Sequence, residues 1–181
     1  MWLHEVEQSI KQLEEKLPKS AKTVLDIGSE GEDYRNVRQP WNKNLYDYLE
    51  SRSMIISTMD LDPNSKADFI HDITQPVSKI GNFDLVIATH LLEHVEKELF
   101  STVINNIESL VKKGGHLIVS VPHKYPYHAR PIDNMWRPTW KELKDVFKGE
   151  LLFGETVEVE HASIQYINDP KCQVSYIFLK Y

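Results

Sequence analysis

The chain has 181 residues, of which 41% are hydrophobic and 27% are charged, and its formal net charge is −6. This length and composition predict one globular domain over residues 1–181 that buries a core without disulfides, and the acidic balance disfavours a nucleic-acid partner. The single cysteine, Cys172, excludes an internal disulfide. No apolar run is long enough to span a membrane, and the charged N-terminus does not read as a secretory signal. We therefore expect a cytoplasmic protein without a membrane partner.

The first half of the chain alternates between predicted helices and strands. Apolar residues recur at three- and four-residue spacing in residues 1–18, which predicts an amphipathic helix that ends at Pro18. A second helix is predicted for residues 41–52. Short continuous apolar runs are typical of buried parallel strands, and they predict strands over residues 23–27, 54–59, 67–71 and 83–88. The last two strands are separated by too short a segment for a crossover helix.

The second half continues the alternation. An apolar stripe from Val95 to Leu110 predicts a helix, and we expect the cations and glycines of Lys112–Gly115 to form its C-terminus. A short helix is predicted for residues 139–147, with Thr139 as its N-cap. Three further strands are expected over residues 116–121, 157–160 and 174–178. This alternation predicts a doubly wound α/β fold with helices on both faces of a mostly parallel sheet.

Four segments carry polar or glycine residues where predicted strands end, at the edge that binds ligands in open α/β sheets. They read TVLDIGSEGE from Thr23, MIISTMDLDP from Met54, FDLVIATHLLEHV from Phe83 and GGHLIVSVPH from Gly114. Their order and content resemble a class I S-adenosylmethionine-dependent methyltransferase. The resemblance implies a Rossmann-like sheet of seven strands with the last strand antiparallel, in a compact version that lacks one helix.

The glycine turn after the first strand allows backbone N–H groups to approach a ligand. In the family this turn holds the methionine end of S-adenosylmethionine. The resemblance assigns the role to Asp26, Gly28, Ser29 and Gly31. The chain departs from the family pattern at Glu30 and Glu32, which replace glycines. Taken without the other segments, the turn could equally be an ordinary connection between a strand and a loop.

Acidic residues follow the second and third strands. A carboxylate at the end of the second strand can accept bonds from two ribose hydroxyls, and the resemblance assigns this role to Asp60, with Leu61 beside it. Asp62 is a rival for it. A dehydrogenase would also have such an acid, but its G-x-G-x-x-G turn is missing here. After the third strand, Asp72 and Ile73 take the family's positions beside the adenine.

The segment from His90 to His94 reads H-x-x-E-H, which is also the inverted zincin pattern of zinc peptidases. We expect no metal, because the segment follows a buried strand in an α/β series and resembles the L-E-H-V of many methyltransferases. Under that resemblance, residues Thr89 to Leu91, which include His90, line the cofactor and the methyl-transfer site. Glu93 and His94 would then open the following helix, where an acid suits the positive end of the helix dipole.

Residues 122–138 form a proline-rich loop without apolar periodicity, of a length that is often functional. It resembles a stretch in a bacterial branch of the family that is often linked to sugar and polysaccharide pathways. We expect it to cover the acceptor site, although an Asp133–Arg137 pair with only a structural role is an equal alternative. The candidate substrate-binding residues are Tyr125, Tyr127, His128, Asp133, Trp136 and Arg137.

These features predict methyl transfer from S-adenosylmethionine to a small polar acceptor, most simply a hydroxyl of a sugar-like compound. A hydroxyl benefits from a base of near-neutral pKa, and histidine supplies one. The sequence does not rank the candidates, which are His90, His94, His123 and His128. The alternatives are N-methylation of a small amine, a non-catalytic module with the same fold, and a zinc hydrolase using His90, Glu93 and His94. The oligomeric state stays open.

Overall fold

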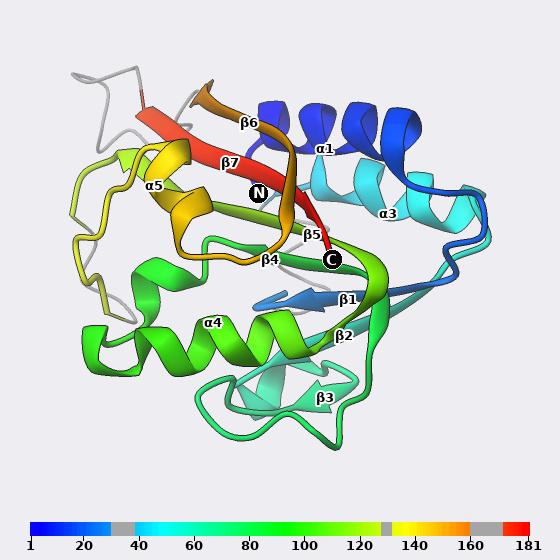
Figure 1. Cartoon of the computed structure of the whole chain (residues 1–181), viewed down its shortest axis with the longest axis horizontal. Helices are drawn as coiled ribbons and strands as arrows, with labels where there is room; N and C mark the ends of the chain where they lie inside the picture. Colours follow the sequence, from blue (N-terminus) through cyan, green and yellow to red (C-terminus); the bar gives the residue numbers. More distant parts are fainter. Residues whose placement is uncertain (30–38, 128–131, 160–171) are drawn as a thin grey trace.

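A seven-stranded sheet in the order β3-β2-β1-β4-β5-β7-β6 organises the chain (Figure 1). The structure is a computed structural model and describes residues 1–29, 39–127, 132–159 and 172–181. Strands β1 to β5 pair in parallel, and β7 runs antiparallel to both of its neighbours. The strands are β1 (Thr23–Ile27), β2 (Ile55–Asp60), β3 (Phe69–Ile70), β4 (Phe83–Thr89), β5 (Val111–Lys124), β6 (Glu150–Val159) and β7 (Cys172–Lys180). The predicted fold class is confirmed, including the antiparallel last strand.

Helices cover both faces of the sheet (Figure 1). They are α1 (Leu3–Lys16), α3 (Asn42–Ser51), α4 (Phe100–Ser109) and α5 (Trp140–Asp145), with short 3-10 turns η2 (Pro63–Ser65), η3 (Leu92–His94) and η4 (Lys97–Leu99). Among the described residues no helix is long and apolar enough to cross a membrane. The described connection from β3 to β4 contains no helix, as its length predicted.

Alternation along the strands divides the core into two layers. Val24 and Ile87 pack with α1 and α3 on one face, while their neighbours Leu25 and Val86 pack with α4 on the other. Because successive side chains of a strand point to opposite faces, a strand covered on both sides is apolar over most of its length. This two-sided burial is why short uninterrupted apolar runs predicted the strands.

The predicted helix between the fourth and fifth strands is wrong at both ends. Glu93 and His94 lie in η3, and α4 begins only at Phe100. At the other end α4 stops at Ser109, and Lys112–Gly115 belong to β5 rather than to a helix terminus. The helix stops because the chain has already entered the sheet: Val111 pairs with Phe83, and the register then shifts before His116.

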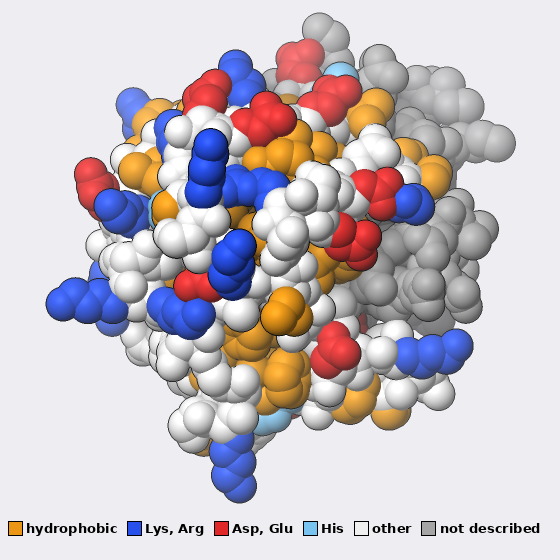
Figure 2. All heavy atoms as spheres, turned by 90° about the vertical axis from the view of Figure 1, so that its right-hand side faces the viewer, with side chains coloured by type: hydrophobic (Ala, Val, Ile, Leu, Met, Phe, Trp, Pro, Cys, Tyr) orange, Lys and Arg blue, Asp and Glu red, His pale blue; other side chains and the backbone are white. Residues whose placement is uncertain are grey.

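The Lys112 side chain binds the carboxylate of Asp84 in the neighbouring strand. This carboxylate accepts bonds from the backbone N–H groups of Lys22 and Thr23, both at 2.9 Å, and from the Lys112 ammonium at 3.0 Å. Burial alone would raise the pKa of Asp84, but these donors lower it to about 2. The cluster joins β1, β4 and β5 where the strands begin. Figure 2 views this side of the molecule, where acidic and basic side chains intermingle over the described part of the surface.

Candidate functional site

The turn after β1 exposes Gly28 at the carboxyl edge of the sheet. Gly28 has a φ of +75°, a left-handed conformation that favours glycine, and its N–H donates to the Met59 carbonyl at 2.8 Å. A Cβ added here would meet the Leu91 side chain at 3.6 Å. Ser29 is buried next to the turn, and Asp26 accepts a bond from the Tyr46 hydroxyl of α3. Gly31 lies outside the described residues, together with Glu30 and Glu32.

The ends of β2 and β3 place a carboxylate beside an exposed apolar side chain. One oxygen of Asp60 accepts the Asp62 N–H at 2.9 Å, which fixes the orientation of the carboxyl group at the surface. Leu61 is 67% exposed, an arrangement that suits an aromatic ring lying against it. Asp72 accepts the Thr74 N–H at 2.9 Å, while Ile73 is buried in the core. The acid and the apolar residue thus have the chemistry that a ribose and an adenine require.

β4 ends in a turn that directs His90 away from the strand. His90 has a φ of +53°, and its N–H donates to the Ser120 carbonyl at 2.9 Å. Thr89 is half-buried next to it. His90 and His94 do not share a helix, so the helical spacing on which the zincin pattern depends is not present. Among the described residues no group of three His, Cys, Asp or Glu is placed to hold a metal ion; whether zinc binds stays a prediction.

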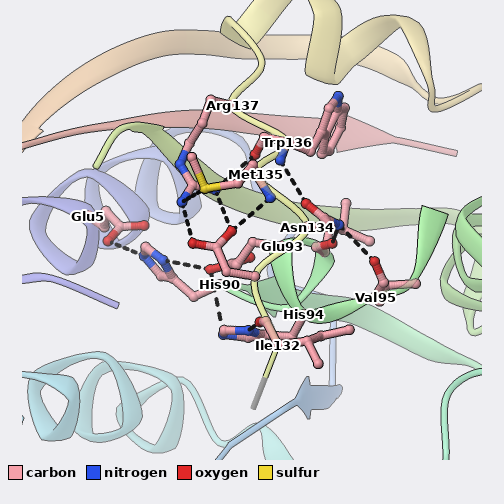
Figure 3. Close-up of polar contacts among 12 residues, drawn as sticks. Glu5, His90, Glu93, His94, Val95, Ile132, Asn134, Met135, Trp136 and Arg137 are labelled. Carbon is pink, nitrogen blue, oxygen red and sulfur yellow. Dashed lines mark hydrogen bonds and ion pairs between the residues drawn. The ribbon is translucent and has the colours of Figure 1, made fainter. Parts of the chain in front are cut away.

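Glu5, which the sequence did not suggest, is the partner of His90. Its carboxylate is fully buried, and Oε2 lies 2.9 Å from His90 Nε2 and 2.8 Å from the Trp2 backbone nitrogen. On the other side of the ring, His90 Nδ1 lies 3.4 Å from Oε1 of Glu93, which is also buried. Figure 3 shows the ring between these two acids.

Burial and charge act in opposite directions on this pair. Burial alone would raise the pKa of Glu5 and lower that of His90, because it disfavours both charged forms. The mutual attraction prevails: the pKa of Glu5 lies below its usual value, and the pKa of His90 above its own. His90 is therefore an imidazolium at neutral pH, with a carboxylate at each ring nitrogen, and is poorly suited to accept a proton.

The loop that follows β5 is fastened to η3. The Asn134 side chain donates to the carbonyls of Leu92 and Val95, at 2.8 and 2.7 Å, and its backbone N–H donates to Glu93 at 2.9 Å. His94 Nδ1 lies 2.6 Å from the Ile132 carbonyl (Figure 3). Asn134 was missed because an isolated asparagine in a loop has no sequence signal until its partners are known.

The residues predicted to bind the methyl acceptor differ from one another in their contacts. Asp133 and Arg137 form a two-bond ion pair, at 3.0 and 2.6 Å, and the Asp133 side chain is fully buried. Trp136 packs edge-on against Phe100, with the ring centroids 4.5 Å apart. The structural alternative for the Asp133–Arg137 pair therefore has direct support, and neither role excludes the other.

Two tyrosines and two histidines complete the predicted set. The ring centroids of Tyr125 and Trp2 lie 6.3 Å apart, and Tyr127 is largely exposed. His123 Nδ1 lies 2.9 Å from the Pro138 carbonyl. Because a carbonyl only accepts, Nδ1 carries the proton and Nε2 is the acceptor in the neutral ring. His128 lies outside the described residues.

A family model for a methyltransferase domain matches residues 2–148. The chain belongs to the methyltransferase-domain family. The predicted class of enzyme is confirmed, and with it S-adenosylmethionine as the cofactor. No curated protein matches the chain significantly.

Solved structures agree on the fold of this methyltransferase. TehB from Haemophilus influenzae superposes with a TM-score of 0.65 at 19% identity, covering 98% of this chain and 61% of that one. NodS from Bradyrhizobium japonicum, an N-methyltransferase crystallised with S-adenosylhomocysteine, has a TM-score of 0.57 at 16% identity, covering 97% and 86%. Coclaurine N-methyltransferase has a TM-score of 0.66 at 12% identity, covering 99% and 72%. At these identities the likeness concerns the fold alone.

Proposed function

We propose that this methyltransferase binds S-adenosylmethionine along the carboxyl ends of β1, β2 and β4 and methylates a small polar acceptor beneath the segment between β5 and α5, since β5 extends to Lys124 and the predicted loop therefore begins later than Pro122. The observation that carries the proposal is the combination at one sheet edge of an open glycine turn at Gly28, the Asp60 carboxylate and the exposed Leu61. The carboxylate offers two acceptor oxygens for the ribose hydroxyls, the leucine side chain offers an apolar face for the adenine, and a glycine without a side chain allows the methionine end to approach the backbone closely.

The residues present divide the work of holding the cofactor. Asp60 would accept the ribose hydroxyls, Leu61 would cover the adenine with Asp72 at its rim, and the turn at Gly28 and Ser29 would hold the methionine end beside Asp26. When bound, the sulfonium supplies an activated methyl group. The protein then contributes alignment of the acceptor and exclusion of water, since an in-line displacement depends on geometry.

Hydroxyl and amine acceptors differ in whether a base must remove a proton during methyl transfer. A sugar-like hydroxyl needs a base, and His90 is held as an imidazolium by Glu5 and Glu93. His123, with its Nδ1 on the Pro138 carbonyl, has the tautomer that a base requires. A neutral amine needs no strong base. The placement of the His90 ring between the carboxyl groups of Glu5 and Glu93, at 2.9 and 3.4 Å, is the observation that favours N-methylation as a second candidate.

A thermal-shift screen tests the proposal. S-adenosylhomocysteine should raise the melting temperature progressively, with the logarithm of its concentration once this exceeds Kd, because a ligand that binds only the native state stabilises it. NAD and zinc, tested in parallel, should not. Stabilisation by NAD or zinc and not by S-adenosylhomocysteine would refute the proposal. Transfer of labelled methyl groups to separate panels of sugars and small amines then distinguishes the acceptors.

A further inference from the structure

The buried Glu5–His90–Glu93 array joins the N-terminal helix to the turn that follows β4, which lies 85 residues further along the sequence. Glu5 comes from α1, His90 directly follows β4, and Glu93 lies in η3. The carboxylate of Glu5 contacts both His90 and the Trp2 backbone, so the same group fixes the beginning of α1 and the imidazole ring. The His90 ring in turn lies edge-on to Trp2, with the centroids 6.5 Å apart.

The other end of the array leads to the acceptor loop. Glu93 accepts the Asn134 N–H on its backbone carbonyl, and the neighbouring His94 holds the Ile132 carbonyl. The 3-10 turn is therefore held at two points: the Glu93 side chain contacts His90, and the Glu93 backbone carbonyl binds the loop. Figure 3 shows this continuous path from Glu5 to the residues around Asn134.

His90 has an unfavourable backbone conformation, which must be stabilised by its surroundings. A non-glycine residue in the left-handed region is disfavoured, and such residues persist where neighbouring contacts over-determine them. At His90 these contacts are the Ser120 carbonyl on the backbone and a carboxylate at each ring nitrogen. Losing one carboxylate should release the ring and the turn together.

We propose that Glu5 is a positioning residue, which acts through His90 and Glu93 to hold the acceptor loop in place at the carboxyl edge of β4. The inference rests on the proposed function only in calling this loop the acceptor cover; the coupling itself is a property of the fold. A purely local ion pair would stabilise α1 against the sheet without affecting residues 132–137.

Hydrogen exchange detected by mass spectrometry separates these two roles, without cofactor or acceptor. The Asn134, Met135 and Trp136 amides are hydrogen-bonded at 2.9, 2.9 and 2.7 Å, so their protection reports on the loop. In Glu5→Gln we expect these amides to exchange about five- to tenfold faster than in the wild type, which is the size of a typical coupling between sites. Glu5→Asp, which keeps the charge, should restore part of the protection.

Two variants of the same helix serve as controls. Val6→Ala shortens a buried side chain of α1 and is the control for the loss of stability in Glu5→Gln. Glu7→Gln removes an exposed acid and is the control for the change of charge. Neither should accelerate exchange in residues 132–137. The double variant Glu5→Gln/His90→Gln should exchange no faster than the more affected single variant, because both residues act along one path.

Wild-type exchange rates in Glu5→Gln, or equal acceleration in Val6→Ala at the same stability, would overturn the proposal. An additive double variant would also overturn it. Failure of the wild type to bind S-adenosylhomocysteine would refute the proposed function and leave this coupling intact, so the two failures are distinguishable.

Discussion

Replacing Asp60 with alanine should weaken S-adenosylhomocysteine binding without unfolding the protein. A carboxylate that accepts hydroxyl groups makes charge-assisted bonds, and losing such a bond costs about 1.5–3 kcal/mol. That corresponds to an increase in Kd of about tenfold to 150-fold. The bond that Asp60 makes to the Asp62 N–H is exposed, so its loss should change the free energy of unfolding little.

Titration calorimetry of the wild type and the variant measures this effect directly. Asp62→Ala is the matched control, because Asp62 is an acid two residues away whose side chain caps η2 through the Asn64 N–H at 2.8 Å. We expect the control to bind with nearly wild-type affinity. Unchanged affinity in Asp60→Ala would refute the ribose assignment, and a loss confined to Asp62→Ala would transfer the role to that residue.

Three further predictions concern charge and backbone. The neighbouring carboxylates raise the pKa of His90 to about 9. The ion pair therefore contributes fully to the free energy of unfolding below the unfolded pKa of about 6.5, and this contribution is lost as the pH rises through about 9. Urea unfolding from about pH 6 to 9.5 should show the decline in stability, and the decline should be smaller in His90→Gln. Asp84→Ala should lower the free energy of unfolding by about 1–3 kcal/mol, because it leaves the N–H groups of Lys22 and Thr23 without their acceptor, while an unchanged urea midpoint would contradict the role of this cluster. Gly28→Ala should cost about 1–2 kcal/mol of stability, because its φ is positive, and calorimetry should show weaker S-adenosylhomocysteine binding; full stability and affinity would mean that the turn tolerates a side chain.

The sequence was informative about the fold where burial and local pattern coincide. The strand from Thr23 to Ile27 was predicted with its observed bounds, because a strand buried on both faces is mostly apolar. The cap at Thr139 was also predicted, and its side chain accepts the Glu142 N–H. A helix C-terminus was wrongly predicted at Lys112–Gly115, because cations followed by glycines are typical of helix ends. Here the contact with Asp84, which is distant in sequence, places Lys112 in the sheet.

The candidate site divides in the same way. Gly28 and Asp60 could be found because the turn and the strand end are local features that recur in the family. Glu5 could not, since an acid in an amphipathic N-terminal helix is usually solvated, and only the tertiary fold brings it 2.9 Å from His90. The interpretation of His90 as a possible base changes for the same reason: its protonation depends on a residue that lies outside every motif.

The most direct test of the account is a crystal structure of the protein with S-adenosylhomocysteine. We expect the ribose hydroxyls within hydrogen-bonding distance of the Asp60 carboxylate, the adenine against Leu61, and the methionine end at the backbone of Gly28. Ligand bound elsewhere, or bound at this edge without contact to Asp60, would contradict the account.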